Sequence, residues 1–181
     1  MRRTVPLFLI LALLLTACDG SRNPPPAAEA VLAAMADTVT RTAQPLPHGW
    51  VYSCAKAADD PYYLTETFFT ALYGRAAEGL LGGLSASDAA APVGDAALFL
   101  SASPYPCELA VFRCSDTDAI PTLVALCRGR LDTVARGFAG TEWESAARGV
   151  VATEGCFVLL VMAEDPEAVV EGARAALERM R

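Results

Sequence analysis

The sequence is short of histidine, of basic residues and of long apolar runs, and each shortage excludes a class of function. His48 is the only histidine among 181 residues, so a histidine-rich metal site cannot form. When Arg2 and Arg3 are set aside as part of an N-terminal leader, 12 basic residues face 21 acidic ones, a balance of −9. No basic stripe is present for a phosphate backbone, and we expect no nucleic-acid partner.

Two further absences concern nucleotide binding and membrane spanning. The pair Gly82-Gly83 is not followed by Lys-Ser or Lys-Thr, so no P-loop is present. The apolar run from Val5 to Leu15 is shorter than the roughly 20 residues that a transmembrane helix needs. The chain is nevertheless 54% hydrophobic. A body of about 160 residues is long enough to fold as one domain with its own core.

The N-terminus carries the most specific pattern in the sequence. Arg2 and Arg3 form a short positive region, and the apolar run follows it. The segment Leu15-Thr16-Ala17-Cys18 resembles a bacterial lipobox. The resemblance implies cleavage after Ala17 and transfer of a diacylglycerol, with palmitate among its acyl chains, to the thiol of Cys18. Two acyl chains hold a protein stably at a membrane, so the expected location is the extracytoplasmic face of the cell membrane.

These signals divide the chain into three parts. Residues 1–17 are predicted to be a lipoprotein signal peptide, and residues 18–26 a lipidated cysteine followed by a proline-rich tether. Residues 27–181 are predicted to form a single α+β domain. Its first part, residues 27–43, is expected to be a peripheral helix, because Val31, Met35 and Val39 recur every fourth residue.

The second half of the chain predicts two similar units, each with two strands followed by a helix. Strands are expected over residues 98–101, 108–114, 150–153 and 156–162, and helices over 120–134 and from 165 onward. Like residues stand 49 positions apart in the two units: Cys107 and Cys156, Asp116 and Asp165, Ala119 and Ala168, Ile120 and Val169. A tandem duplication or two independent solutions to the same packing problem would both explain this.

We therefore predict an α+β fold with a four-stranded, largely antiparallel sheet and the two long helices on one face. Extra N-terminal helices would lie elsewhere on the domain. The last strand is apolar on both faces, which indicates a central strand or a sheet covered on both sides. On the helix over 120–134, Arg128 and Arg130 are expected mostly on the polar face, opposite Leu123 and Cys127.

Acidic residues mark the expected helix starts. Asp60-Pro61 predicts a helix over 62–73, Ser115 or Asp116 can cap the helix that follows, and Asp165 can cap the last one. Asp116 and Asp118 stand close enough in sequence to suggest a metal site, but no further ligands cluster near them. Capping is the favoured interpretation, and we predict neither a metal nor a cofactor.

The segment from His48 to Cys54 is the one place where the sequence suggests catalysis. A cysteine and a histidine together can form a thiolate nucleophile, but a third group that orients the base is not visible. The intervening aromatic residues Trp50 and Tyr52 are expected to cover an edge of the core, or to stack on a ligand. No catalytic residue is predicted, and a cleft near His48 and Cys54 or the pair Asp59-Asp60 remains the alternative.

Five cysteines follow Cys18, and the sequence leaves their state open: Cys54, Cys107, Cys114, Cys127 and Cys156. Their number is odd, most lie in apolar runs, and their spacing matches no zinc pattern. Buried free thiols are the favoured interpretation, with one disulfide or a metal site as alternatives.

Several segments together resemble a family of small, uncharacterised lipoproteins of anaerobic Firmicutes, classed as a domain of unknown function. They are Leu46-Pro-His-Gly, Tyr62-Tyr-Leu, Leu72-Tyr-Gly, Ala97-Leu-Phe-Leu-Ser and Glu108-Leu-Ala-Val-Phe-Arg-Cys followed by Asp116 and Asp118. The resemblance implies a lipid anchor, a single domain and an external location, and it transfers no catalytic residue. We expect a membrane-anchored, non-catalytic binding or envelope-associated module with an unknown protein or small-molecule ligand. A cell-envelope hydrolase is the alternative.

Overall fold

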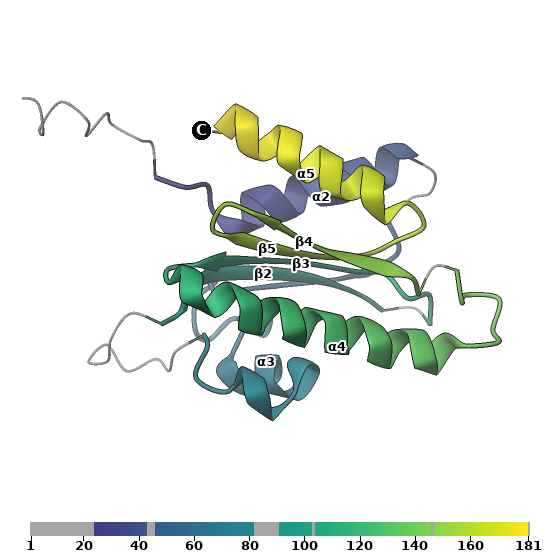
Figure 1. Cartoon of the computed structure of the whole chain (residues 1–181), viewed down its shortest axis with the longest axis horizontal. Coiled ribbons are helices and arrows are strands. Elements are labelled where there is room, and N and C mark those ends of the chain that lie inside the picture. Colours follow the sequence, from purple (N-terminus) through teal and green to yellow (C-terminus); the bar gives the residue numbers. More distant parts are fainter. Residues whose placement is uncertain (1–23, 43–45, 82–90, 103, 146, 181) are drawn as a thin grey trace, which may run out of the picture.

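The computed structural model describes residues 24–42, 46–81, 91–102, 104–145 and 147–180 (Figure 1). The predicted signal peptide and the lipobox residues, including Cys18, lie outside these ranges. The described chain is an α+β domain, as predicted, with one antiparallel sheet between two layers of helices (Figure 1).

The sheet has five strands where the sequence predicted four. They are β1 (Gly49–Ser53), β2 (Val93–Ser101), β3 (Glu108–Cys114), β4 (Gly149–Glu154) and β5 (Phe157–Met162), in the order β1-β2-β3-β5-β4. The two predicted hairpins are present as β2-β3 and β4-β5, and β3 and β5 pair between them. The fifth strand is the short aromatic segment at the edge.

β1 escaped prediction because its side chains do not alternate between buried and exposed. Trp50 and Val51 are consecutive residues and both are 40% exposed, and Ser53 is the only fully buried residue of the strand. The strand is held instead by backbone pairing with β2, from Gly49 opposite Ser101 to Ser53 opposite Ala97. Backbone pairing of this kind does not require alternating hydrophobic and polar side chains, so the sequence pattern does not reveal it.

The helices lie on both faces of the sheet, which corrects the expectation that the two long helices share one face. α2 (Ala28–Thr42) and α5 (Pro166–Met180) cover one face, and α3 (Glu66–Tyr73) and α4 (Ile120–Phe138) cover the other (Figure 1). α4 and α5 therefore pack on the same two strands, β4 and β5, from opposite sides.

The composition of β5 explains this arrangement. All six of its residues are buried, with Phe157, Leu159 and Val161 in the core beneath α5 and the alternate residues in the core beneath α4. α4 connects β3 to β4 and packs over β5 on the way, so it occupies one face of these strands. The other face would expose a row of large apolar side chains unless α5 covered it.

α2 joins the core at the point where the predicted tether enters the domain. Its first backbone N–H, at Ala28, donates to Asp95 Oδ2 on β2 at 2.8 Å, and Arg113 Nη2 on β3 lies 3.8 Å from the same oxygen. Further along α2, Gly172 of α5 permits close contact between the two helices, because a Cβ at position 172 would clash with Thr38 of α2. α2 is thus fixed at its start by a buried carboxylate and along its length by α5.

Of the three predicted helix caps, Asp165 is confirmed, and Asp116 caps the short 3₁₀ turn Thr117–Ala119 that leads into α4, which itself has no side-chain cap. Asp116 Oδ1 accepts from the Asp118 N–H in the turn before α4, and Asp165 Oδ1 accepts from the Ala168 N–H at the start of α5. The prediction at Asp60-Pro61 is wrong by several residues. Asp60 Oδ1 accepts from the Tyr62 N–H in a turn, and α3 begins later, with the Thr65 hydroxyl accepting from the Phe68 N–H.

Candidate functional site

The structure places His48 and Cys54 at opposite ends of β1. Six residues of extended chain separate their backbones by about 20 Å. His48 is exposed and its ring meets Trp50 edge-on, with ring centroids 6.2 Å apart. Cys54 is half-buried, and its Sγ lies 3.9 Å from the Leu64 carbonyl oxygen. The geometry does not bring a base to this thiol.

The electrostatics at Cys54 also disfavour a nucleophile. Burial, with a smaller contribution from the carboxylate of Asp95, raises the pKa of Cys54 to about 11. The thiol is therefore protonated at neutral pH and is a weak nucleophile. Asp60, named with Asp59 as an alternative candidate, accepts from the Tyr62 N–H in its own turn.

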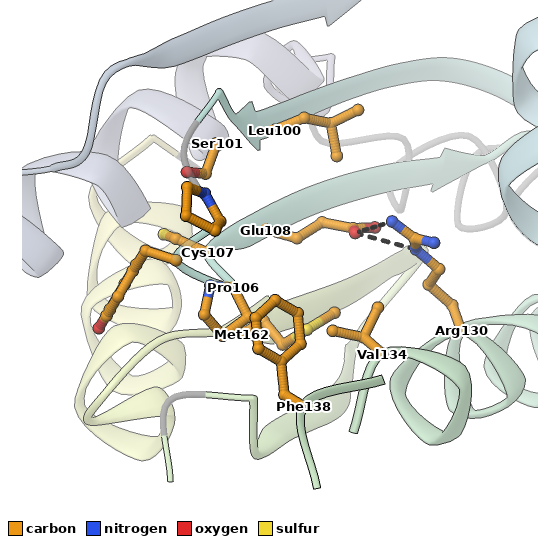
Figure 2. Close-up of a pocket in the computed structure, with 11 residues that line it drawn as sticks. Leu100, Ser101, Pro106, Cys107, Glu108, Arg130, Val134, Phe138 and Met162 are labelled. Carbon is orange, nitrogen blue, oxygen red and sulfur yellow. Dashed lines mark hydrogen bonds and ion pairs between the residues drawn. The ribbon is translucent and has the colours of Figure 1, made fainter. Parts of the chain in front are cut away.

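A different part of the domain holds a cavity of about 250 Å³ between the β2-β3 turn and the C-terminal half of α4 (Figure 2). Most of its wall is apolar or aromatic, and its two charged residues lie side by side at one end (Figure 2). It is lined by Leu100, Ser101, Pro104, Tyr105, Pro106, Cys107, Glu108, Arg130, Val134, Phe138 and Met162.

The charged end of the cavity is an ion pair between neighbouring elements. Glu108, the first residue of β3, is 3% exposed. Its Oε2 accepts from Arg130 Nε at 3.0 Å and from Arg130 Nη2 at 2.8 Å (Figure 2). Its Oε1 accepts from the hydroxyl of Tyr73, at the end of α3, at 3.1 Å. Both carboxylate oxygens are thus engaged, which is the condition for burying this charge.

Glu108 raises the pKa of both side chains that donate to it. Burial alone would lower the pKa of Arg130, but attraction and hydrogen bonding to Glu108 outweigh it and raise that pKa. Burial, followed by the nearby carboxylate of Glu108, raises the pKa of Tyr73 well above its ordinary value. Arg130 is therefore charged and Tyr73 neutral at any physiological pH. The cluster is a fixed, net-neutral polar group and is not poised for proton transfer.

The helical pattern predicts Arg130 mostly on the polar face of α4, but the structure places it against Glu108 in the wall of the cavity. Arg130 follows the fully buried Cys127 by three residues and precedes Val134 by four, which is the spacing of one helix face. That spacing, together with a glutamate as the first residue of an otherwise apolar strand, is the sequence feature from which the Glu108–Arg130 pair could have been predicted. The cavity itself could not be foreseen, because it depends on how α4 crosses the hairpin.

The remaining cysteines do not form a reactive site in the described chain. All five cysteines there are free, and Cys107, Cys114 and Cys127 are buried. Cys107 lines the cavity, but burial, with a smaller effect of Glu108, raises its pKa to about 12. Within the same ranges, no three or more His, Cys, Asp or Glu side chains are grouped so that they could hold a metal ion.

Two further observations bear on function. None of the helices in the described ranges combines the length and the apolar character that a membrane span requires. Comparisons of the chain with protein-family models, with curated proteins and with solved structures found no match.

Proposed function

We propose that this chain is a bacterial lipoprotein, held at the extracytoplasmic face of the cell membrane by a diacylglyceryl group on Cys18. The observation that carries the proposal is the leader, in which a positive start and an apolar run precede Leu15-Thr16-Ala17-Cys18. The likeness of several segments to uncharacterised lipoproteins of anaerobic Firmicutes is part of the same proposal.

The domain itself is proposed to be a non-catalytic module that binds a small ligand in the cavity beside Glu108 and Arg130. Three features support binding without catalysis. The wall is mostly apolar, the two charges already neutralise each other, and the one thiol in the wall, Cys107, has a raised pKa. The cavity volume corresponds to about eight water molecules at about 30 Å³ each. A ligand of this size with an apolar body and a neutral polar end fits these walls.

The anchor is tested by replacing Cys18 with alanine. This change should abolish incorporation of radioactive palmitate and release the domain from the membrane fraction, because no thiol remains at the position that the lipobox marks for diacylglycerol transfer. Labelling of cells that express each variant, followed by fractionation, measures both effects.

Cys156→Ala is the matched control for this experiment. Cys156 is a half-buried free cysteine in the turn between β4 and β5, so its loss should leave labelling and fractionation unchanged. Palmitate that persists on the Cys18→Ala chain would refute the proposed anchor.

The ligand site is tested with para-fluorobenzamide, followed by fluorine NMR on the lipidated protein in nanodiscs. This neutral probe should bind with a Kd on the order of 1 mM, as expected for so small a molecule. Para-fluorobenzoate and para-fluorobenzylammonium should bind at least about tenfold more weakly, because each would lose hydration and meet one repelling charge of the Glu108–Arg130 pair.

Val134→Trp, which fills the cavity, should abolish binding of the amide. Thr133→Trp is its control, because Thr133 is the exposed neighbour on α4 and does not line the cavity. Equal binding to both variants would show that the probe does not occupy this site, whatever the state of the lipid anchor.

A further inference from the structure

β1 carries an exposed apolar surface at the edge of the sheet. Trp50 and Val51, each 40% exposed, are the large hydrophobic side chains that the described part of the chain leaves exposed. On the side of α3, Tyr52 packs against Phe68 and Tyr62, with ring centroids 4.5 and 5.7 Å apart. Lys56 Nζ lies 5.7 Å from the ring centroid of Tyr62. Tryptophan, tyrosine and lysine are the residues that gather at the membrane–water interface.

On the other side of β1, the same surface continues into a groove against α2. The groove has a volume of about 290 Å³ and is almost entirely apolar. It is lined by Glu29, Leu32, Ala33, Ala36, Leu46, Val51 and Phe99. We call β1 together with this groove the β1 surface. An apolar surface of this kind on one edge of a domain is typical of a site that contacts another phase or another molecule.

The backbone of β1 limits how deep such a contact can be. The N–H of Ser53 donates to the Tyr62 carbonyl and its own carbonyl accepts from Leu64, so the polar groups of Ser53 point away from β2. In an antiparallel pair this direction alternates, so Val51 and Gly49 also direct their N–H and C=O groups outward. Unpaired backbone groups cannot enter the hydrocarbon core of a bilayer, but headgroups and water satisfy them at its surface.

The position of the anchor brings the β1 surface within reach of a bilayer. Cys18 precedes Ala28 by ten residues, which span at most about 35 Å. Ala28 is fixed to Asp95 near the start of β2, and Trp50 lies opposite Leu100, five residues further along that strand. Five residues of strand are about 17 Å, so the surface is closer to the attachment point than the tether is long.

We propose that the β1 surface rests on the lipid bilayer, with Trp50, the backbone of β1 and the α2 groove at headgroup depth and the side chain of Val51 directed toward the upper acyl chains. This inference rests on the lipid anchor of the proposed function. The anchor supplies attachment, and the β1 surface fixes the orientation of the domain. Contact at headgroup depth satisfies the outward backbone groups of Gly49 and Val51 and removes apolar side chains from water.

The test uses the lipidated full-length mature protein in phosphatidylcholine nanodiscs with lipids brominated near the headgroup end of the acyl chains. The chain has two tryptophans, so Trp143→Phe leaves Trp50 as the reporter and Trp50→Phe leaves Trp143. Trp143 contacts Tyr105 beside the ligand cavity and serves as the matched control. The Trp50 reporter should lose roughly half of its emission and the Trp143 reporter very little, since only the former lies at interface depth.

Further variants define the surface. Val51→Asp in the Trp50 reporter should remove most of the quenching, whereas Ala125→Asp, an exposed change on α4, should not. Equal quenching of the two reporters, or none at Trp50, in protein whose mass shows the diacylglyceryl group would overturn the contact and leave the anchor standing. A mass without that group would instead refute the anchor. Efficient cross-linking of Val51→Cys between two chains would assign the surface to a second copy and also overturn the inference.

Discussion

Replacing Arg130 by methionine should lower the free energy of unfolding by about 3–5 kcal/mol, because it leaves a charged carboxylate buried without its partner. Glu108 is 3% exposed, and both of its interactions through Oε2 come from Arg130. Only the Tyr73 hydroxyl would remain bound to it. Urea denaturation followed by circular dichroism measures the loss.

Two companion variants separate the ion pair from the helix that carries it. Arg128→Met changes an exposed arginine on the same helix and should stay within about 0.5 kcal/mol of the wild type. The double variant Glu108→Gln with Arg130→Met removes both charges and keeps an acceptor for Tyr73, so it should regain most of the stability. A single Arg130→Met change that costs less than about 1 kcal/mol would mean that water reaches Glu108 and that the pair is not desolvated.

Raising the pH from 8 to 10 should lower the free energy of unfolding by about 5 kcal/mol. Burial raises the pKa of Cys54 and Cys114 to about 11 and that of Cys107 to about 12, from an ordinary value of 9.0. Burial also raises the pKa of the fully enclosed Cys127. Each thiol that ionises only in the unfolded chain weakens the fold by about 1.4 kcal/mol per pH unit above its unfolded pKa.

The sign of this pH dependence is set by whether the folded or the unfolded chain binds more protons. A raised pKa in the folded state means that the folded chain holds protons that the unfolded chain releases, so stability is complete below about pH 9. It is lost as the pH rises through the window from 9 to about 12 in which these thiols titrate. Urea titrations at pH 8, 9 and 10 measure the slope.

Cys127→Ala removes one of the four titrating thiols and provides the control. Its stability at pH 8 should be lower because a small cavity opens, but its further loss up to pH 10 should be smaller by about 1 kcal/mol. An unchanged stability between pH 8 and 10 in the wild type would contradict the buried, protonated state of these cysteines.

The sequence predicted well those features that are set by residues close together in the chain. The β2-β3 and β4-β5 hairpins depend on turn residues between apolar runs, and both are present. The cap at Asp165 depends on one side chain and the next few N–H groups, and it too is confirmed, whereas Asp116 caps only the 3₁₀ turn before α4. The α+β class follows from the same local signals.

Features set by long-range packing could not be predicted in this way. The two strand-strand-helix units have similar sequence patterns, yet α4 and α5 lie on opposite faces of the sheet. β5 pairs between β3 and β4, and because α4 covers one face of β4 and β5, only the other face is open to α5. The candidate site was missed for a related reason. Arg130 is a surface residue by type, and only its contact with Glu108, 22 residues earlier, brings it into the core.

The hydrogen bond from Ala28 to Asp95 has a mechanical consequence. If the domain is pulled away from the membrane, the force enters the fold at the first residue of α2. There it passes through Asp95 into β2, which is flanked by β1 and β3, and through Arg113 into β3 as well. The pulling force is therefore borne by β2 and β3, and the N-terminal end of α2 is protected from being pulled off the sheet.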